Sequence, residues 1–199
     1  MDAAERLGGQ YGLDNVSVRM IATEAGVNLS AIGFHYRTRE ALVRAMLVRR
    51  LAPLMERRRE ALASLTEGPA APTAEQVLGA FFDPLFEMSA GGSPGERAFL
   101  RVLAQTLVTP SPELREVLDG ELAAGAAAFL KALARALPGL THEEISNRMD
   151  FAVGAVGHAL ADPTRRGTYA LAEPAADVRR LAPQLMAFIT AGLRAPPTL

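Results

Sequence analysis

The strongest constraint on the fold of this 199-residue chain is residues 17–42, which read SVRMIATEAGVNLSAIGFHYRTREAL. Ser17 can cap a short helix, and Gly26 can adopt the left-handed backbone conformation that ends it. Asn28 can then cap a second short helix, LSAIGFHY, and Thr38 can cap a longer helix that follows at once. Two short helices joined by a glycine turn, with a third helix behind them, predict a helix-turn-helix unit.

The side chains of this unit divide into an inward and an outward set. Apolar residues at helical spacing predict the inward set, which comprises Val18, Ile21, Ala22, Ala25, Ile32 and Tyr36. The second helix opens at residues 28–31, and the start of such a helix is the part that enters a DNA major groove. We therefore interpret residues 17–42 as a DNA-binding helix-turn-helix.

Several motifs in the first quarter of the chain follow a known family pattern in register. They read Ala3-Ala4-x-x-Leu7, Gly12, Ser17-x-Arg19-x-Ile21-Ala22-x-x-Ala25-Gly26-Val27, Phe34-His35-Tyr36 and Thr38-Arg39-Glu40-x-Leu42. These residues closely resemble the N-terminal domain of the tetracycline-repressor (TetR) family of transcriptional regulators. The resemblance implies a helix-turn-helix DNA-binding domain over residues 1–45 and a helical ligand-binding and dimerisation domain over 46–199. It also implies a repressor that binds a palindromic double-stranded DNA operator as a homodimer and is released by a small-molecule inducer.

Three glycines depart from the family pattern. Gly8 and Gly9 stand where the first helix of the family has a core Phe and a good helix former. Glycine in a helix interior costs about 1 kcal/mol relative to Ala, so the first helix should be weak and prone to fraying. Gly33 stands where the family often has a phosphate-contacting Tyr, although a glycine also lets a DNA backbone approach closely. These departures keep an alternative open, a helical dimeric small-molecule-binding protein with weak or lost DNA binding.

The matched positions imply a set of DNA contacts. The set comprises Ser17, Arg19, Asn28, Leu29, Ser30, Ala31, Gly33, Phe34, His35 and Arg39. Residues 28–31 should face base edges, where Asn can pair with adenine and an apolar side chain can touch a thymine methyl. His35 and Arg39 should bind phosphates. Arg19 can reach a phosphate, a guanine or a neighbouring acid, and Phe34 can stack on the DNA or pack into the core of the unit.

The composition favours an all-α fold with a basic N-terminal part. The chain is rich in Ala and Leu and has no Trp, and the absence of Cys excludes disulfides and thiolate chemistry. Through residue 60, ten arginines stand against seven acidic residues, whereas the rest of the chain is acidic. This asymmetry suits a protein that presents one end to a polyanion, although a solvated surface would also produce it. Arg49, Arg50 and the run of arginines at 57–59 are expected to lie on a solvated face.

Capping signals divide the rest of the chain into six further helices and no strand. Polar N-caps, capping boxes, N1 prolines and the helix-breaking Pro-Gly at 138–139 place these helices at 39–65, 73–88, 93–108, 111–137, 141–161 and 174–193. A polar loop is expected over residues 162–173. With the three N-terminal helices, the chain is predicted to have about nine.

The last two helices carry apolar residues that step by three and four. One seam comprises Ile145, Met149, Ala152 and Val156, and the other comprises Val178, Leu181, Leu185 and Phe188. Such narrow seams pack helix against helix, so they predict the four-helix dimer interface that the resemblance implies. The alternative is that both seams pack within one subunit.

The middle helices should enclose a pocket for an apolar or amphipathic inducer. The predicted lining comprises Phe82, Phe86, Phe99, Leu103, Gln105, Thr106, Phe129, Phe151 and His158. Most of the apolar residues in this set would otherwise be ordinary core. His158 interrupts an apolar run and needs a partner if it is buried.

Other classes of protein fit the sequence less well. The three histidines have no metal-ligand spacing, and we expect neither a metal, a cofactor, catalytic residues nor enzyme activity. The N-terminus has no apolar signal segment, and no apolar run is long enough for a membrane span. We therefore expect a cytoplasmic protein with no membrane partner.

Overall fold

The computed structural model describes residues 1–67, 70–108, 112–161 and 178–197 of the protein, and this part of the chain is all-α, as predicted. The elements are α1 Asp2–Tyr11, the 3₁₀ turn η1 Leu13–Asn15, α2 Val18–Ala25, α3 Leu29–His35, α4 Arg39–Thr66, α5 Ala74–Gly91, α6 Pro94–Val108, α7 Pro112–Ala136, α8 His142–Ala161 and α9 Val178–Leu193. Their order matches the nine predicted helices, with η1 as an unpredicted addition. The polar loop predicted at 162–173 and the predicted start of the last helix at 174 lie outside the described residues.

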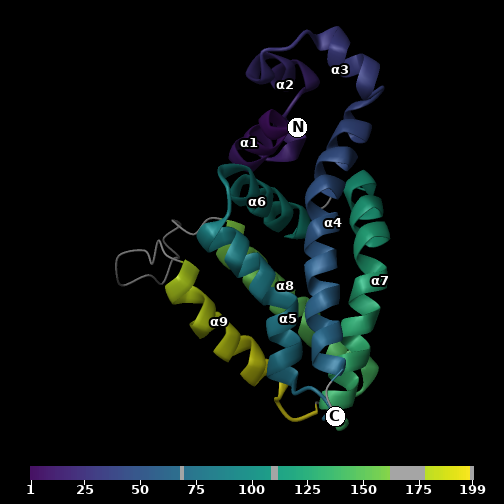
Figure 1. Ribbon diagram of the computed structural model, residues 1–199, viewed down its shortest axis with the longest axis vertical. Helices are drawn as coiled ribbons and strands as arrows, with labels where there is room; N and C mark the ends of the chain where they lie inside the picture. The colour runs from purple at the N-terminus through teal and green to yellow at the C-terminus, as the bar shows by residue number, and fades with distance from the viewer. Residues whose placement is uncertain (68–69, 109–111, 162–177, 198–199) are drawn as a thin grey trace.

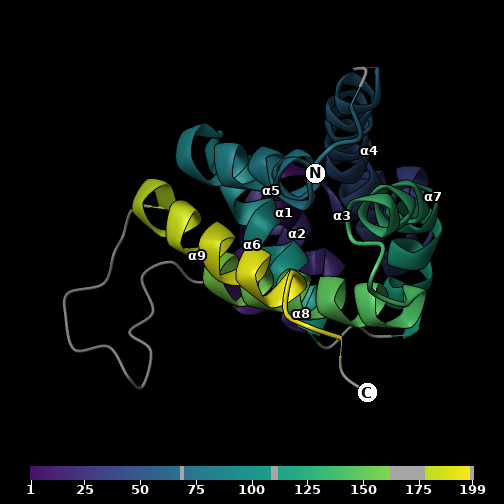
Figure 2. The same cartoon turned by 90° about the horizontal axis from the view of Figure 1, so that it is seen from below.

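The molecule has two parts joined by the longest helix (Figure 1). We call α1–α3 the head and α5–α9 the body, and α4 runs from the head along the body beside α5 and α7. Helix α6 packs against α1 on one side and α8 on the other, so it lies between the head and the body core. Seen from below, α9 lies along the outside of the body next to α8 (Figure 2).

The helix starts follow the capping residues that the sequence predicted. Ser17 Oγ accepts a hydrogen bond from the backbone N–H of Met20 at 3.2 Å, and Asn28 Oδ1 accepts one from Ser30 at 2.9 Å. Gly26 closes α2 with φ 65° and ψ 29°, in the left-handed region. Thr73 and Gln76 form the predicted capping box at the start of α5. These local interactions fix where each helix begins.

The expected weakness of the first helix is not observed, since α1 is continuous through both of its glycines. A Cβ on Gly9 would lie 2.9 Å from the backbone oxygen of Ala98 in α6, and one on Gly8 would lie 2.7 Å from a methyl of Leu13. Both distances are shorter than ordinary contacts, so the absence of side chains lets α1 approach α6 closely. Tertiary packing therefore offsets the low helix propensity of the two glycines.

A buried ion pair also holds the head to α4, which corrects the prediction that Arg49 and Arg50 lie on a solvated face. Glu5 of α1 has no exposed surface, and its Oε1 lies 2.6 Å from Arg49 and 2.9 Å from Arg50. The second oxygen of Glu5 accepts another hydrogen bond from Arg50 at 2.9 Å. Arg49 also binds Asp2 at 2.6 Å, which lowers the pKa of that carboxyl. No local pattern indicates this pairing, because the residues are about 45 positions apart in the chain.

Candidate functional site

The exposed surface of the head coincides with the residues predicted to read DNA. Residues 28–31, Gly33, Phe34 and His35 are all exposed along α3, whereas Ile32 faces the core with 8% of its surface exposed. Phe34 is 85% exposed, so the alternative that it packs into the head is excluded. Phe34 lies near the end of α3, with its ring centre 5.6 Å from that of His35.

The capping residues of the head keep hydrogen-bonding groups available for DNA. The Ser17 oxygen accepts the helical N–H of Met20, which leaves its hydroxyl proton to donate. Asn28 uses one lone pair of Oδ1 as a cap, and its amide N–H groups carry no bond within the described part of the chain. Both side chains are exposed at helix N-termini, where positive dipole ends favour phosphate groups.

The two arginines predicted to bind DNA differ in their surroundings. Arg19 is exposed and has no ion-pair partner among the described residues, and Glu24 of the same helix pairs with Arg6 at 2.9 Å. Arg39 is half-buried, and its guanidinium donates to two backbone carbonyls, to Val16 at 3.0 Å and to Leu13. Arg39 therefore ties η1 and the start of α2 to α4, a structural role that its motif position did not reveal.

Helices α4–α8 surround a cavity of about 640 Å³. Three residues of the predicted pocket, Phe82, Leu103 and Phe129, lie in its lining. Leucines of α4 and residues of α8 such as Val153 and Leu160 complete a largely apolar wall that the sequence-based prediction missed. The volume is in the range of small-molecule sites, so the cavity can enclose an apolar ligand.

The other six predicted pocket residues do not line this cavity, and the prediction is corrected for them. Phe86 and Phe99 are buried elsewhere in the core, and the buried Thr106 donates its hydroxyl proton to the Val102 carbonyl of its own helix at 2.8 Å. The remaining residues are exposed and comprise Gln105, Phe151 and His158. The reason is geometric, because residue type and helical spacing do not reveal which side of a helix faces inward.

One cation lies in this apolar wall, and it belongs to the arginine run that was expected to be solvated. Arg58 is 6% exposed, and its Nε donates to the Phe81 carbonyl at 2.8 Å. The guanidinium carbon lies 3.7 Å from the centre of the Phe81 ring, and that ring packs edge-on against Phe129. Burial lowers the pKa of Arg58 to about 9, so the guanidinium stays cationic at neutral pH.

The predicted dimer seam of α8 faces the interior of the subunit instead. Ile145, Met149, Ala152 and Val156 are 0–7% exposed, and Val156 lines the cavity. On α9, Leu181 and Leu185 are half-buried, and the side chain of Val178 lies outside the description. These six described positions therefore do not form an outward seam. The large apolar side chains exposed on the two helices are Phe151 at 73% and Phe188 at 70%.

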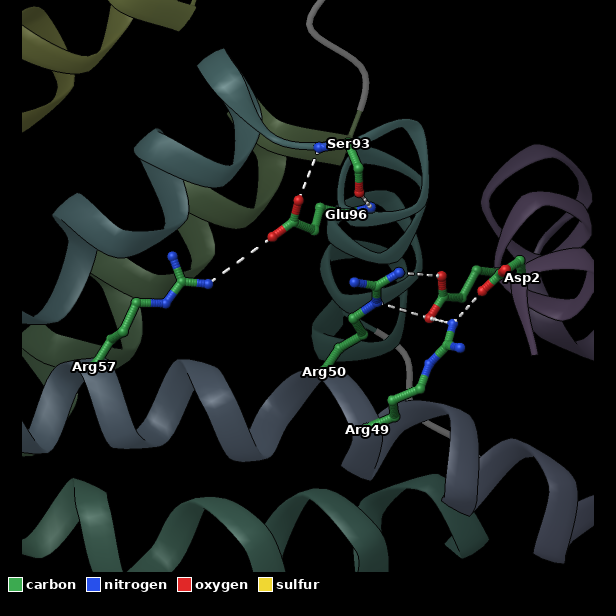
Figure 3. A network of polar contacts seen from close by, with 7 residues as sticks. Asp2, Arg49, Arg50, Arg57, Ser93 and Glu96 are labelled. Carbon is green, nitrogen blue, oxygen red and sulfur yellow. Dashed lines mark hydrogen bonds and ion pairs between the residues drawn. The ribbon is translucent and has the colours of Figure 1, made fainter.

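Two groups of polar contacts lie side by side along α4: the Glu5 pairs bind it to α1, and a second group binds it to the start of α6 (Figure 3). Beyond the Glu5 pairs, Glu96 at the start of α6 accepts the backbone N–H of Ser93 at 2.7 Å and lies 4.0 Å from Arg57. The bond from Ser93 lowers the pKa of Glu96. Helix α6 thus contacts the α1 glycines Gly8 and Gly9, forms an ion pair with α4, and lines the cavity with Leu100, Leu103 and Ala104.

Two family models match the sequence. The model described as "Bacterial regulatory proteins, tetR family" matches residues 1–46, and the one described as "Tetracyclin repressor-like, C-terminal domain" matches residues 79–192. No curated protein matches the chain significantly. A search of the described helices for one long and apolar enough to cross a membrane found no candidate.

Proposed function

The chain belongs to the tetracycline-repressor (TetR) family of ligand-responsive DNA-binding regulators, and we propose that it is a cytoplasmic repressor that binds a palindromic operator as a homodimer. Residues 1–45 bind the DNA, and residues 46–199 hold the ligand and form the dimer. The observation that carries the proposal is the exposed side of α3, where residues 28–31, Gly33, Phe34 and His35 face outward without contacts to the body. Such an exposed helix, capped by polar residues, is the form that enters a major groove.

Within this surface, each residue type has a chemical role. Asn28 and Ser30 at the start of α3 offer amide and hydroxyl groups to base edges, and the exposed Leu29 and Ala31 offer apolar contact to a thymine methyl. Ser17, Arg19 and His35 bind the phosphates that set the register of the head on the duplex. Arg39 contributes by holding the start of α2 in place.

The homodimer follows from the outer face of α8 and α9. Phe151 and Phe188 are exposed on two helices that lie side by side, and small residues such as Gly154 and Gly192 are exposed on the same helices. Exposed apolar patches mark interaction surfaces, and small residues let two helix pairs approach closely. A symmetric pair of heads would then meet successive major grooves, about 34–36 Å apart, on a palindromic site.

Release of DNA follows from the position of α6. A ligand in the cavity touches α6, and α6 rests directly on α1 of the head. A ligand that binds more tightly when the heads are wrongly spaced for the operator shifts the protein into that state. Gly8 and Gly9 have a packing role in this arrangement, so they no longer favour the alternative in which DNA binding is lost.

The experiment is DNA binding measured by gel shift and fluorescence anisotropy, with the DNA that flanks the protein's own gene and a salt titration. Ser30→Ala should change the free-energy preference for one base over the others at a single operator position by about 1–3 kcal/mol. The matched control Ser64→Ala, an exposed serine of α4, should leave the preference unchanged. Absence of salt-dependent binding to any fragment would instead support a helical small-molecule-binding protein without DNA binding.

A further inference from the structure

One charged side chain of the cavity wall, the guanidinium of Arg58, is buried and held in a fixed position. Arg58 is fixed at two points, by the hydrogen bond from its Nε to the Phe81 carbonyl and by the ring of Phe81 beneath its plane. An arginine has five N–H donors, and this bond uses one of them. The four N–H groups on the two Nη nitrogens form no hydrogen bond within the described part of the chain.

These free donors border open space in the cavity. No fully enclosed side-chain nitrogen or oxygen of the described residues lacks a hydrogen-bond partner, so the unpartnered Nη nitrogens keep some accessible surface, and Arg58 is one of the residues that line the cavity. The rest of the wall near them is built from leucines and from the aromatic rings of Phe81, Phe82 and Phe129. A cation with free donors therefore faces a largely apolar chamber.

No acidic side chain neutralises Arg58 among the described residues, in contrast to four other arginines of α4. Arg49 and Arg50 share the carboxylate of Glu5, and Arg59 pairs with Glu56. The charged lining residues besides Arg58 are Glu56, Arg59 and Asp150, and all three are exposed to solvent. A buried charge without a counterion is costly unless something else pairs with it.

From this arrangement we propose that the cavity binds an apolar carboxylic acid, whose carboxylate pairs with the Nη groups of Arg58 while its hydrocarbon part fills the leucine and phenylalanine walls. A carboxylate matches the planar fork of a guanidinium with two parallel hydrogen bonds. The pKa of about 9 leaves Arg58 charged at neutral pH, where the ligand is also ionised. This proposal rests on the proposed ligand-responsive function and names the class of its ligand.

The test is isothermal titration calorimetry on the full chain with probes that share one hydrocarbon length. Decanoate, decanol and decylammonium, each used below its solubility or micelle limit, share a ten-carbon chain and carry an anionic, a neutral and a cationic head group. We expect decanoate to bind about 10-fold or more tightly than decanol, and decylammonium to bind more weakly than either. Equal affinity for decanoate and decanol, or tighter binding of decylammonium, would overturn the proposal. Titration with 2-naphthoate then separates a fatty-acid ligand from an aromatic carboxylate.

Two variants test whether Arg58 is the cation that pairs with the carboxylate of decanoate. Arg58→Met should lower decanoate affinity about 10- to 100-fold and leave decanol affinity within about threefold. The control Arg44→Met, at an exposed arginine of the same helix that does not line the cavity, should change neither affinity more than about threefold. Unchanged decanoate affinity in Arg58→Met would place the anion elsewhere and refute the assignment. If Arg58→Met fails to fold, the three-probe series on the native protein still decides.

Failure of this proposal is distinguishable from failure of the proposed function, because ligand binding is measured without DNA. Decanoate that binds as expected but leaves operator affinity unchanged would support the carboxylate site and contradict ligand-driven release. Operator binding in a protein that shows no preference for decanoate would support the regulator and contradict the carboxylate site.

Discussion

Glu5 places a carboxylate with no exposed surface between two arginines of α4, at the junction between the head and the rest of the molecule. Its three short contacts to guanidinium groups replace the hydration that burial removes. The carboxylate is therefore both a link between α1 and α4 and the counterion for two partly buried cations. Removing its charge should leave Arg50 without its carboxylate partner and Arg49 with Asp2 alone.

We predict that Glu5→Gln lowers the free energy of unfolding by about 3 kcal/mol, since breaking a buried ion pair typically costs about 3–5 kcal/mol and both arginines keep some solvent contact. Urea denaturation followed by circular dichroism measures this difference. The control Glu60→Gln removes an exposed acid of α4 and should change stability by less than about 0.5 kcal/mol. Equal stability of the two variants would show that the buried pair contributes nothing.

Arginine roles could not be predicted from the sequence at the level of single residues. Arg58 and Arg59 are neighbours, yet one is buried in the cavity wall and the other is exposed beside Glu56. Arg39 matched a phosphate-binding position in the family pattern but holds backbone carbonyls of η1 and the turn before α2. The partner of a long side chain depends on segments far away in the chain, and no local pattern encodes them.

At the scale of elements, the helix starts were predictable because their causes are local. A cap such as Ser17 or Thr73 bonds a backbone N–H within three residues, so the sequence alone places it. The inward side of a helix was less predictable. On α8, the buried set Ile145, Met149, Ala152 and Val156 and the exposed set Asn147, Phe151, Gly154 and His158 have the same spacing. Periodicity identified the seam but could not tell which set the body would cover.

Substitution by Ala should have opposite effects on stability at Gly9, where α1 packs on α6, and at Gly33, where α3 is open. Gly9→Ala should lower the free energy of unfolding by about 1–3 kcal/mol, because its Cβ would meet the backbone oxygen of Ala98, which cannot change rotamer. Gly33→Ala should raise the free energy of unfolding by about 0.5–1 kcal/mol, because nothing lies within 4 Å of its Cβ in α3.

Thermal and urea denaturation of both variants measure these effects. Stabilisation by Gly9→Ala would show that α1 and α6 are not in close contact in solution. Destabilisation by Gly33→Ala would show that helix propensity does not decide stability in α3.

At the scale of the whole molecule, the proposed dimer depends on aromatic side chains that the subunit leaves uncovered. We predict that Phe188→Glu raises the dimer dissociation constant at least about 30-fold, since central aromatic residues of an interface typically contribute 2 kcal/mol or more. Analytical ultracentrifugation over a concentration series measures the constant. The matched control Phe34→Glu changes another highly exposed Phe, in the head, and should leave the dimer intact. A dimer that tolerates Phe188→Glu but not Phe34→Glu would place the interface in the head.

The sequence was sufficient to predict the family, the all-α architecture and the outward surface of the head, because short motifs in register indicate all three. The residues that line the cavity were only partly predictable, since five helices from distant parts of the chain build its wall. Phe82, Leu103 and Phe129 were identified, whereas Arg58 was assigned to solvent. The presence of a buried cation in the cavity wall therefore depends on how α4 packs against α5 and α7, and the sequence alone does not reveal that packing.

The contact of Gly9 with the backbone of Ala98 has a mechanical consequence. Where side chains separate two helices, they act as a soft layer that absorbs small displacements through slight changes of torsion. Here main chain meets main chain, so the joint between α1 and α6 is stiff, and any displacement of α6 passes to the head undamped. In such a protein, a small displacement of α6 is enough to carry the effect of ligand binding from the cavity to the head.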